Sequence, residues 1–181
     1  TLNLEELLAT GAEVIIDLGD FKKSIAEDLT ALQEQTGLPC IFIEADFTHM
    51  ADAFRSLGSI LGKEERGEEL AKLVEETMTM AAENSAKITD DQRLSVLYSS
   101  GSDPLGTNAE GSSQAQVLGI VGATNAVVVE DVTSKGGGNM INMEQLYNFD
   151  PDVVLVTDPM ALEIVETEAA WQELRAVKDG K

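Results

Sequence analysis

Histidine and cysteine, the side chains that most often bind soft metals or act as base and nucleophile, are scarce in this sequence. His49 is the only histidine and Cys40 the only cysteine. A zinc site built by a protein takes three or four His, Cys or carboxylate ligands, so this pair predicts no metal site. Cys40 lies in the apolar run 38–43, which is typical of a buried strand thiol. His49 falls in the first turn of a predicted helix, where a surface role is commoner than a ligand role.

Serine and glycine gather in two loops, and neither loop carries a catalytic motif. Residues 99–113 contain no GxSxG elbow, and no motif places the single histidine as a base. The segment 133–139 has three consecutive glycines but fits neither the P-loop nor the dinucleotide fingerprint. These glycines form either a tight turn or a loop whose N–H groups can approach a ligand. The sequence therefore predicts binding rather than catalysis, with no cofactor.

Composition and charge exclude several classes of partner. The 181 residues are 43% hydrophobic and 25% charged, which is typical of one globular domain or two small lobes. Acidic residues number 33 against 12 basic ones, a net charge of −21. Such a surface repels phosphate backbones, so nucleic acid is excluded as a partner. No apolar run reaches the ~20 residues that cross a bilayer. The start at Thr1, with neither Met nor a signal peptide, predicts a mature or excised form.

A long helix is predicted over residues 62–88, because apolar residues recur there at helical spacing with no proline or turn cluster. The expected stripe is Leu70, Leu73, Val74, Thr77, Met78 and Ala81. A helix of this length is well above the usual 11–12 residues. Such a helix usually joins two bodies.

Two similar segments flank the predicted helix. Residues 3–20 and 142–159 align without a gap, and each reads as a short helix, a turn and an apolar strand. The alignment pairs Asn3 with Asn142 and Glu5 with Glu144. A generic helix-to-strand unit of any α/β protein remains the alternative explanation. We predict two similar lobes, with the first lobe at 1–61, the long helix at 62–88 and the second lobe at 89–181.

The remaining elements follow from apolar runs, caps and turn residues. Strands are predicted at 13–17, 40–44, 94–98, 126–129 and 153–157. Helices are predicted at 21–36, from Asp46 or Thr48 to about Leu61, at 112–121 and at 159–174. We expect 13–17 to pair with 40–44 in one sheet, and 94–98 to pair with 153–157 in another.

Several stretches together carry a family resemblance: NLEELLATGAEVIID, LGKEERGEELAKLVEET, GTNAEGSSQAQVLGIVGATNAV and GGGNMINMEQLYNFDPDVVLVTDP. The chain resembles the substrate-binding proteins of iron-complex or vitamin B12 type ABC importers. The resemblance implies an α/β fold with two Rossmann-like lobes, parallel sheets and one joining helix. Full members are longer, so both lobes are expected to be incomplete, as in an excised fragment or a family offshoot. Bare sheet edges would then invite self-association with another copy.

The resemblance also implies a function and a site. It implies an extracytoplasmic protein, in the periplasm or on the cell surface as a lipoprotein, and not an enzyme. Such a protein captures a metal chelate, such as a ferric siderophore, haem or a cobalamin-like molecule, and delivers it to the ABC permease in the membrane. The ligand is expected between the lobes, at the carboxyl ends of their strands. The implied ligand-binding residues are Leu18, Gly19 and Asp20 in the first lobe, and Leu105, Gly106, Thr107, Asn108, Gly137, Gly138 and Asn139 in the second.

A surface glutamate on each lobe docks onto the permease in this family, and Glu5 and Glu144 match that feature. The alternative for each glutamate is stabilisation of the start of its own helix. Two other functions remain open from the residues alone: an α/β regulatory or enzyme domain, and a folded fragment that binds no ligand.

Overall fold

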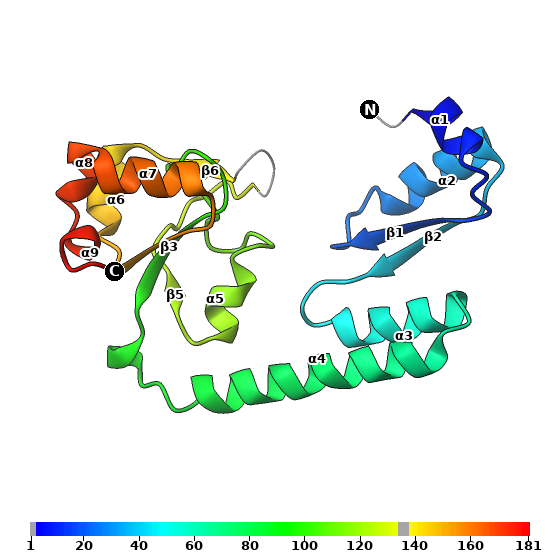
Figure 1. The fold of residues 1–181 in the computed structure, drawn as a ribbon, viewed down its shortest axis with the longest axis horizontal. Helices are drawn as coiled ribbons and strands as arrows, with labels where there is room; N and C mark the ends of the chain where they lie inside the picture. The colour runs from blue at the N-terminus through cyan, green and yellow to red at the C-terminus, as the bar shows by residue number, and fades with distance from the viewer. Residues whose placement is uncertain (1–2, 134–137) are drawn as a thin grey trace. The chain divides into compact units, whose positions relative to one another are not determined.

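The computed structural model describes residues 3–133 and 138–181. The chain divides into two compact units, unit 1 at Thr1–Thr77 and unit 2 at Met78–Lys181. Each unit contains its own parallel sheet (Figure 1). The predicted α/β class with parallel sheets is confirmed. No helix among the described residues is long and apolar enough to cross a membrane.

Unit 1 is built on a pair of parallel strands. Its elements are α1 Leu4–Ala9, β1 Ile15–Gly19, α2 Ile25–Thr36, β2 Cys40–Glu44 and α3 Met50–Ile60. Ile15 lies opposite Cys40 and Gly19 opposite Glu44, so the predicted pairing of these two strands is confirmed. Figure 1 shows α2 and α3 on opposite sides of the strand pair. Because β1 and β2 are parallel, their carboxyl ends lie at the same edge of unit 1.

The long helix α4 spans Glu64–Ser85, slightly shorter than the predicted 62–88. Its first turns pack on α3 through two glycines, because the backbones approach too closely for a side chain between Gly58 and Gly67. Arg55 of α3 also pairs with Glu68 and Glu75 of α4, at 2.8 Å in each case.

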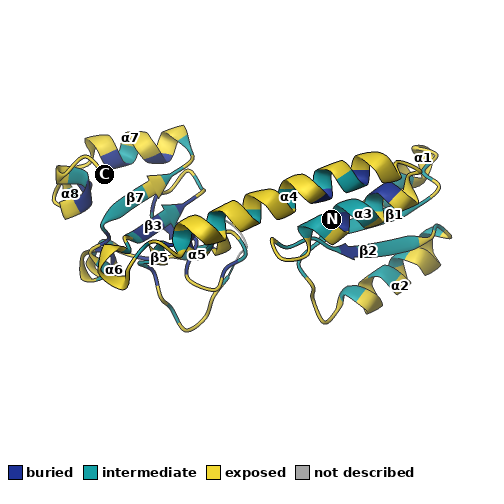
Figure 2. Ribbon diagram, turned by 90° about the horizontal axis from the view of Figure 1, so that it is seen from below, coloured by how far each residue is buried: buried dark blue, intermediate teal, exposed yellow. Residues whose placement is uncertain are grey.

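The apolar stripe of α4 differs from the prediction. Figure 2 shows most of the helix exposed. Gly67 and Ala71 are the buried residues of this helix, whereas Leu73 is 58% exposed. The predicted stripe placed Leu73 on the buried side of the helix and is wrong at this residue. The residues that α4 buries are small, because its backbone approaches α3 too closely for large side chains.

Unit 2 has a three-stranded parallel sheet in the order β5-β3-β7. Its strands are β3 Ser95–Ser99, β4 Gly106–Thr107, β5 Thr124–Asn125, β6 Asn139–Met140 and β7 Val153–Val156. Its helices after α4 are η1 Asp90–Gln92, α5 Gln116–Ile120, α6 Met143–Phe149, α7 Pro159–Thr167, α8 Ala169–Gln172 and α9 Arg175–Lys178. The predicted pairing of 94–98 with 153–157 is confirmed. Leu97, Leu146 and Trp171 lie at the centre of the core.

Two predicted elements of unit 2 are wrong. The strand expected at 126–129 lies instead at Thr124–Asn125, because the Asn125 side chain accepts a hydrogen bond from the Val127 N–H and ends the ladder. The helix expected at 159–174 breaks at Glu168. There the Gln172 side chain donates to the carbonyls of Val165 and Glu166, which replaces the missing helical bonds.

The two repeat segments fold alike at their starts. Asn3 caps α1 by accepting from the N–H groups of Glu5 and Glu6 at 3.2 and 3.3 Å. Asn142 caps α6 by accepting from the Gln145 N–H at 2.9 Å, and the Gln145 side chain accepts from the Asn142 N–H in return. A strand of the unit's own sheet follows each helix, as the sequence predicts. The shared asparagine is therefore a shared helix cap.

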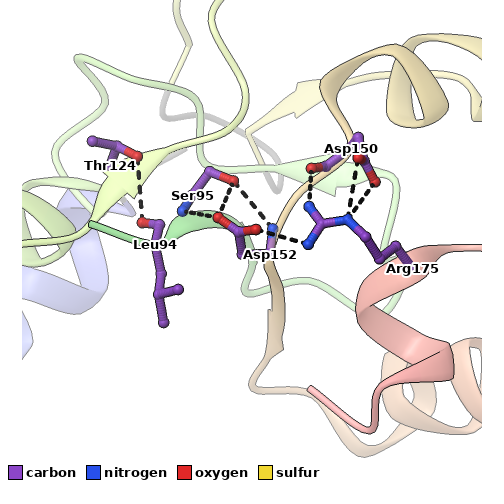
Figure 3. Close-up of polar contacts among 6 residues, drawn as sticks. All are labelled: Leu94, Ser95, Thr124, Asp150, Asp152 and Arg175. Carbon is purple, nitrogen blue, oxygen red and sulfur yellow. Dashed lines mark hydrogen bonds and ion pairs between the residues drawn. The ribbon is translucent and has the colours of Figure 1, made fainter. Parts of the chain in front are cut away.

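A polar network joins the amino ends of β3 and β7 (Figure 3). The Asp152 carboxylate accepts hydrogen bonds from the N–H and the hydroxyl of Ser95 at 2.9 and 3.0 Å. Arg175 of α9 pairs with Asp152 at 2.9 Å and with the Asp150 carboxylate at 3.2 Å. Because these bonds stabilise the charged form, the Ser95 N–H and then Arg175 lower the pKa of Asp152. The network therefore fixes the amino ends of β3 and β7. The predicted ligand loops follow the carboxyl ends of the strands, at the opposite edge of the sheet.

Candidate functional site

The predicted ligand residues of unit 1 lie where β1 ends. Gly19 is the last residue of β1, and its carbonyl accepts a hydrogen bond from the Ala45 N–H at 3.0 Å. Leu18 is 47% exposed, so its side chain is available to a ligand, and Asp20 is half-buried. Phe21, which sequence reasoning missed, is 62% exposed and contacts the Phe42 ring edge-on at a centroid distance of 6.5 Å. The available signal in the sequence was a phenylalanine directly after the predicted ligand residues Leu18, Gly19 and Asp20.

The loop after β2 brings together three side chains that sequence reasoning did not group. Glu44 ends β2, Asp46 follows it, and His49 is the N-cap residue of α3. One ligand atom from each of the three lies within 4.8 Å of the others. The prediction of no metal site compared one histidine and one cysteine with the three or four ligands that a zinc site takes, and it did not single out the carboxylates three and five residues before His49.

Hydrogen bonds perturb the titration of this loop. Asp46 Oδ1 accepts from the Thr48 hydroxyl at 2.8 Å and from the His49 N–H at 2.9 Å. With the His49 ring also within 2.9 Å, these bonds lower the pKa of Asp46 to about 2. The same contact with Asp46 raises the pKa of His49. Asp46, rather than Thr48, thus organises the start of α3, although the cap position itself belongs to His49.

The predicted ligand residues of unit 2 come together as an antiparallel ribbon. Gly106 and Thr107 of β4 pair with Met140 and Asn139 of β6. The Thr107 hydroxyl donates to the Asn139 carbonyl at 3.0 Å. Gly138 has φ +87° and lies against the Thr107 carbonyl, where a Cβ would overlap it. Glycine is therefore required at 138 by the fold, and an approach of the glycine N–H groups to a ligand stays a prediction.

The predicted ligand residues Gly106, Thr107 and Asn108 are all buried, and the side chains of the last two serve the fold. Thr107 is fully buried and Asn108 is 2% exposed. The Asn108 side chain donates to Ser100 Oγ at 3.0 Å, and its carbonyl accepts from the Asn125 side chain at 2.7 Å. Ser99 Oγ donates to the Gly106 carbonyl at 2.7 Å. We call Ser99, Thr107 and Asn108, together with the half-buried Asn125 that bonds Asn108, the buried polar cluster. Direct ligand contact by Thr107 and Asn108 stays a prediction, and Gly137 lies outside the described residues.

Leu105 and Asn139 differ from these buried residues. Leu105 is half-buried and packs against the core of unit 2, and its carbonyl accepts from the Ile141 N–H. Asn139 is also half-buried, and its side chain accepts from the Thr133 N–H and donates to the Asp131 carbonyl. Asn139 thereby holds the loop before the ribbon rather than offering free polar atoms.

A cavity of about 250 Å³ lies beside α5 and β5 in unit 2, and none of the predicted ligand residues lines it. Glu110, Gly111, Ser112 and Asn125 contribute to its lining. Ser112 Oγ is buried without a hydrogen-bond partner among the described residues. This is an unsatisfied buried hydroxyl, but its oxygen is closed off from solvent and gives a ligand no direct contact.

Glu5 and Glu144 occupy equivalent positions in the two units. Each is the second residue of its helix and is exposed. The asparagine caps already satisfy helix N–H groups through their own side chains. Neither glutamate forms an ion pair within the part of the chain that the structure describes. Both carboxylates are therefore free to bind a partner.

Comparison with known proteins identifies relatives over nearly the whole chain. The Fe(3+)-citrate-binding protein YfmC of Bacillus subtilis is 25% identical over 99% of this chain and 55% of its own length. The uncharacterized ABC transporter substrate-binding lipoprotein YvrC of the same organism is 20% identical over 98% of this chain and 55% of its length. A solved ABC transporter solute binding protein from Sulfurospirillum deleyianum superposes with a TM-score of 0.88 at 26% identity, covering 100% of this chain and 55% of that one.

The chain thus spans about half the length of the curated relatives that it matches. The relatives are named for binding a solute for transport, not for catalysis. The family described as periplasmic binding protein matches residues 1–181, which confirms the resemblance seen in the sequence. The chain belongs to the periplasmic binding protein family.

Proposed function

We propose that this chain is part of an extracytoplasmic solute-binding protein of an ABC importer, and that the solute is a metal chelate. The observation that carries the proposal is the family match over the whole chain. The chain folds as two α/β units, each with its own parallel sheet. The name of the Fe(3+)-citrate-binding relative favours an iron chelate among the alternatives of siderophore, haem and cobalamin. The word lipoprotein in the name of the second relative supports a place outside the cytoplasmic membrane.

We assign the direct contacts in unit 1 to the carboxyl end of β1 and the residues directly after it. Leu18 supplies an exposed apolar side chain and Gly19 a backbone open to close approach, since no atom lies within 4 Å of the position of a Cβ. The neighbouring Phe21 adds an aromatic face. Apolar contact with a few oriented polar groups is the usual make-up of small-molecule sites.

In unit 2 we assign the contacts to the β4–β6 ribbon, with the buried polar cluster supporting it from beneath. Leu105 and Gly138 are half-buried and can be reached by a ligand, while the buried Gly106, Thr107 and Asn108 and the half-buried Asn139 fix the shape of the ribbon through the bonds described above. Gly137 remains part of the proposed site by its place in the sequence. A ribbon held by internal hydrogen bonds loses little conformational entropy when a ligand binds.

The chelate site is tested by isothermal titration with Fe(III)-citrate, a ferric hydroxamate siderophore, haem and cobalamin. Leu18→Asp is the test variant, and Leu8→Asp is the control, because Leu8 of α1 is likewise 47% exposed. We expect at least tenfold weaker binding of the preferred chelate by Leu18→Asp and unchanged binding by Leu8→Asp. Equal affinities in the two variants would remove the carboxyl end of β1 from the site. Absence of binding to all four probes by the intact binding protein would favour the regulatory or fragment alternatives.

We further propose that Glu5 and Glu144 dock the protein onto its permease. The support is their equivalent, exposed and unpaired placement on two units. Arginine pairs bidentately with carboxylates, so arginines of the permease are the expected partners. Self-association through sheet edges remains a separate prediction, which sedimentation analysis addresses.

Docking is tested in the intact binding protein by combining Glu5→Ala with Glu144→Ala. We expect unchanged chelate binding and loss of transport. The control combines Glu6→Ala with Glu163→Ala, which also removes one surface carboxylate from each unit. Transport at the parental rate by the Glu5/Glu144 double variant would leave these residues with helix stabilisation alone.

A further inference from the structure

The Glu44–Asp46–His49 cluster has the composition of a metal site. His49 Nδ1 lies 2.9 Å from Asp46 Oδ1 and 3.9 Å from Glu44 Oε1. The side chains of Glu44, Asp46 and His49 are 37%, 22% and 47% exposed, so an ion can reach all three. One imidazole and two carboxylates are donors that divalent first-row metals accept together.

The fold positions each donor on a different kind of support. Glu44 is the last residue of β2 and lies opposite Gly19 in the sheet. The Asp46 carboxylate is held by the N–H of Thr48 and the N–H of His49, at 2.8 and 2.9 Å. The His49 backbone begins α3, whose next residues are helical. The donor atoms are therefore anchored by a strand end, a bonded turn and a helix start.

The spacing of the donors suits the bond lengths of zinc. Zinc bonds to nitrogen and oxygen of about 2.0–2.2 Å place octahedral ligand atoms about 2.8–3.1 Å apart and tetrahedral ones about 3.3–3.6 Å apart. His49 Nδ1 and Asp46 Oδ1 are hydrogen-bonded at 2.9 Å, Nδ1 lies 3.9 Å from Glu44 Oε1, and all three atoms fall within 4.8 Å, so an ion would take the place of the His49–Asp46 hydrogen bond.

The charge around the cluster favours a cation. Neither Glu44 nor Asp46 pairs with a lysine or arginine among the residues that the structure describes, where His49 is the counter-charge of both. Arg55, on the next turns of α3, is engaged by Asp52, Glu68 and Glu75 instead. A divalent ion at this place would give Glu44 and Asp46 a stronger counter-charge than His49 provides.

Space for the remaining ligands of the ion lies beside the cluster. A cavity of about 400 Å³ between β2 and α3 is lined by Glu44, His49, Asp52 and Ser56 together with apolar residues, while Asp46 lies outside its lining. Three protein ligands with an adjacent open cavity leave positions for water or for an oxygen of a bound anion.

We propose that Glu44, Asp46 and His49 bind a divalent first-row transition-metal ion on unit 1, with the open coordination positions facing the cavity between β2 and α3. All three ligands come from one unit, so the proposal stands independently of chelate capture. Coordination through His49 Nδ1 requires that this nitrogen carry no proton, since only then does it have a lone pair for the metal.

The single histidine makes a direct test possible. Zn²⁺ added to the protein is followed through the imidazole resonances in the NMR spectrum, which belong to His49 alone, and by isothermal titration. Co²⁺ then reports coordination through its visible absorption. We expect micromolar Zn²⁺ affinity, a shift of both ring resonances at one equivalent, and at least tenfold weaker binding in both His49→Gln and Glu44→Gln. Glu27→Gln, an exposed glutamate of α2, is the control with unchanged affinity.

Non-specific attraction to the 33 acidic residues predicts a different result. In that case Ca²⁺ binds as well as Zn²⁺, the imidazole resonances do not move, and His49→Gln has no effect on affinity. That outcome overturns the proposal. Far-UV circular dichroism of each variant verifies that it is folded, and Asp46 is left intact because its side chain holds the turn before α3. Failure of chelate binding would leave a positive zinc result standing, so the two proposals are tested separately.

Discussion

The α3–α4 contact gives a sharp prediction for Gly67→Ala. An added Cβ at residue 67 would lie 2.6 Å from the Phe54 carbonyl oxygen and 3.0 Å from Gly58 Cα, against an ordinary contact of 3.4 Å or more. Both neighbours are backbone atoms, which cannot rotate away. The helices must therefore separate locally by about 0.8 Å, the difference between 3.4 and 2.6 Å. Overpacking of this kind costs about 2–3 kcal/mol.

Helix propensity opposes that cost. Alanine is better than glycine in a helix interior by about 1 kcal/mol, so the net loss of unfolding free energy is about 1–2 kcal/mol. With a urea m-value of about 2 kcal/mol/M, the unfolding midpoint falls by about 0.5–1 M. Circular dichroism at 222 nm in urea measures this change.

The matched control for Gly67→Ala is Gly119→Ala in α5. Gly119 also lies in a helix, is exposed, and has nothing within 4 Å of the position of its Cβ. Propensity then acts alone, and the variant gains up to about 1 kcal/mol. If Gly67→Ala is as stable as Gly119→Ala, the close approach of α3 and α4 does not exist in solution.

Three further predictions concern unit 2. Asp152→Asn lowers the free energy of unfolding above the ordinary carboxyl pKa of 3.8. Because the pKa of Asp152 is depressed in the folded state, this difference from the parent disappears as the pH falls through the folded-state value. Acid titration followed by fluorescence of the buried Trp171 measures the change. Asn142→Ala costs about 1 kcal/mol in urea unfolding, whereas Asn142→Gly costs only a few tenths; equal losses would contradict a capping role. Gly138→Ala costs at least about 2 kcal/mol, because its positive φ and the Thr107 carbonyl both oppose a side chain, and a thermal melt unchanged from the parent would contradict this.

Local patterns were sufficient to predict much of the fold. The β-branched runs at Ile15–Gly19 and Val153–Val156 and the matching Asn3 and Asn142 identified strands and helix starts that the structure contains. The apolar run after Asn125 misled the prediction because Val127 is buried through a turn rather than a strand. Apolarity predicts burial, and it does not by itself distinguish an extended chain in a sheet from one in a loop.

The candidate site was less predictable, for a physical reason. Thr107 and Asn108 look like ligand contacts in sequence, but their polar atoms bond other parts of unit 2 from 8 to 32 residues away. The proximity of Glu44 to His49 depends on the bend between β2 and α3, which the Asp46 side chain creates. Sequence shows which polar groups exist, whereas only the folded chain shows which of them are already satisfied.

The buried polar cluster of unit 2 has a consequence for how this protein can evolve. The side chains of Ser99, Thr107 and Asn125 donate to backbone carbonyls of neighbouring segments and that of Asn108 donates to Ser100 Oγ, so a change at any of them leaves a buried or half-buried polar group unpaired. Selection for folding therefore preserves these residues whatever solute is bound. Exposed residues such as Leu18 and Phe21 escape that constraint. Solute preference can therefore change through substitutions at these exposed residues. An unchanged Thr107–Asn108 pair then indicates a shared fold rather than a shared solute.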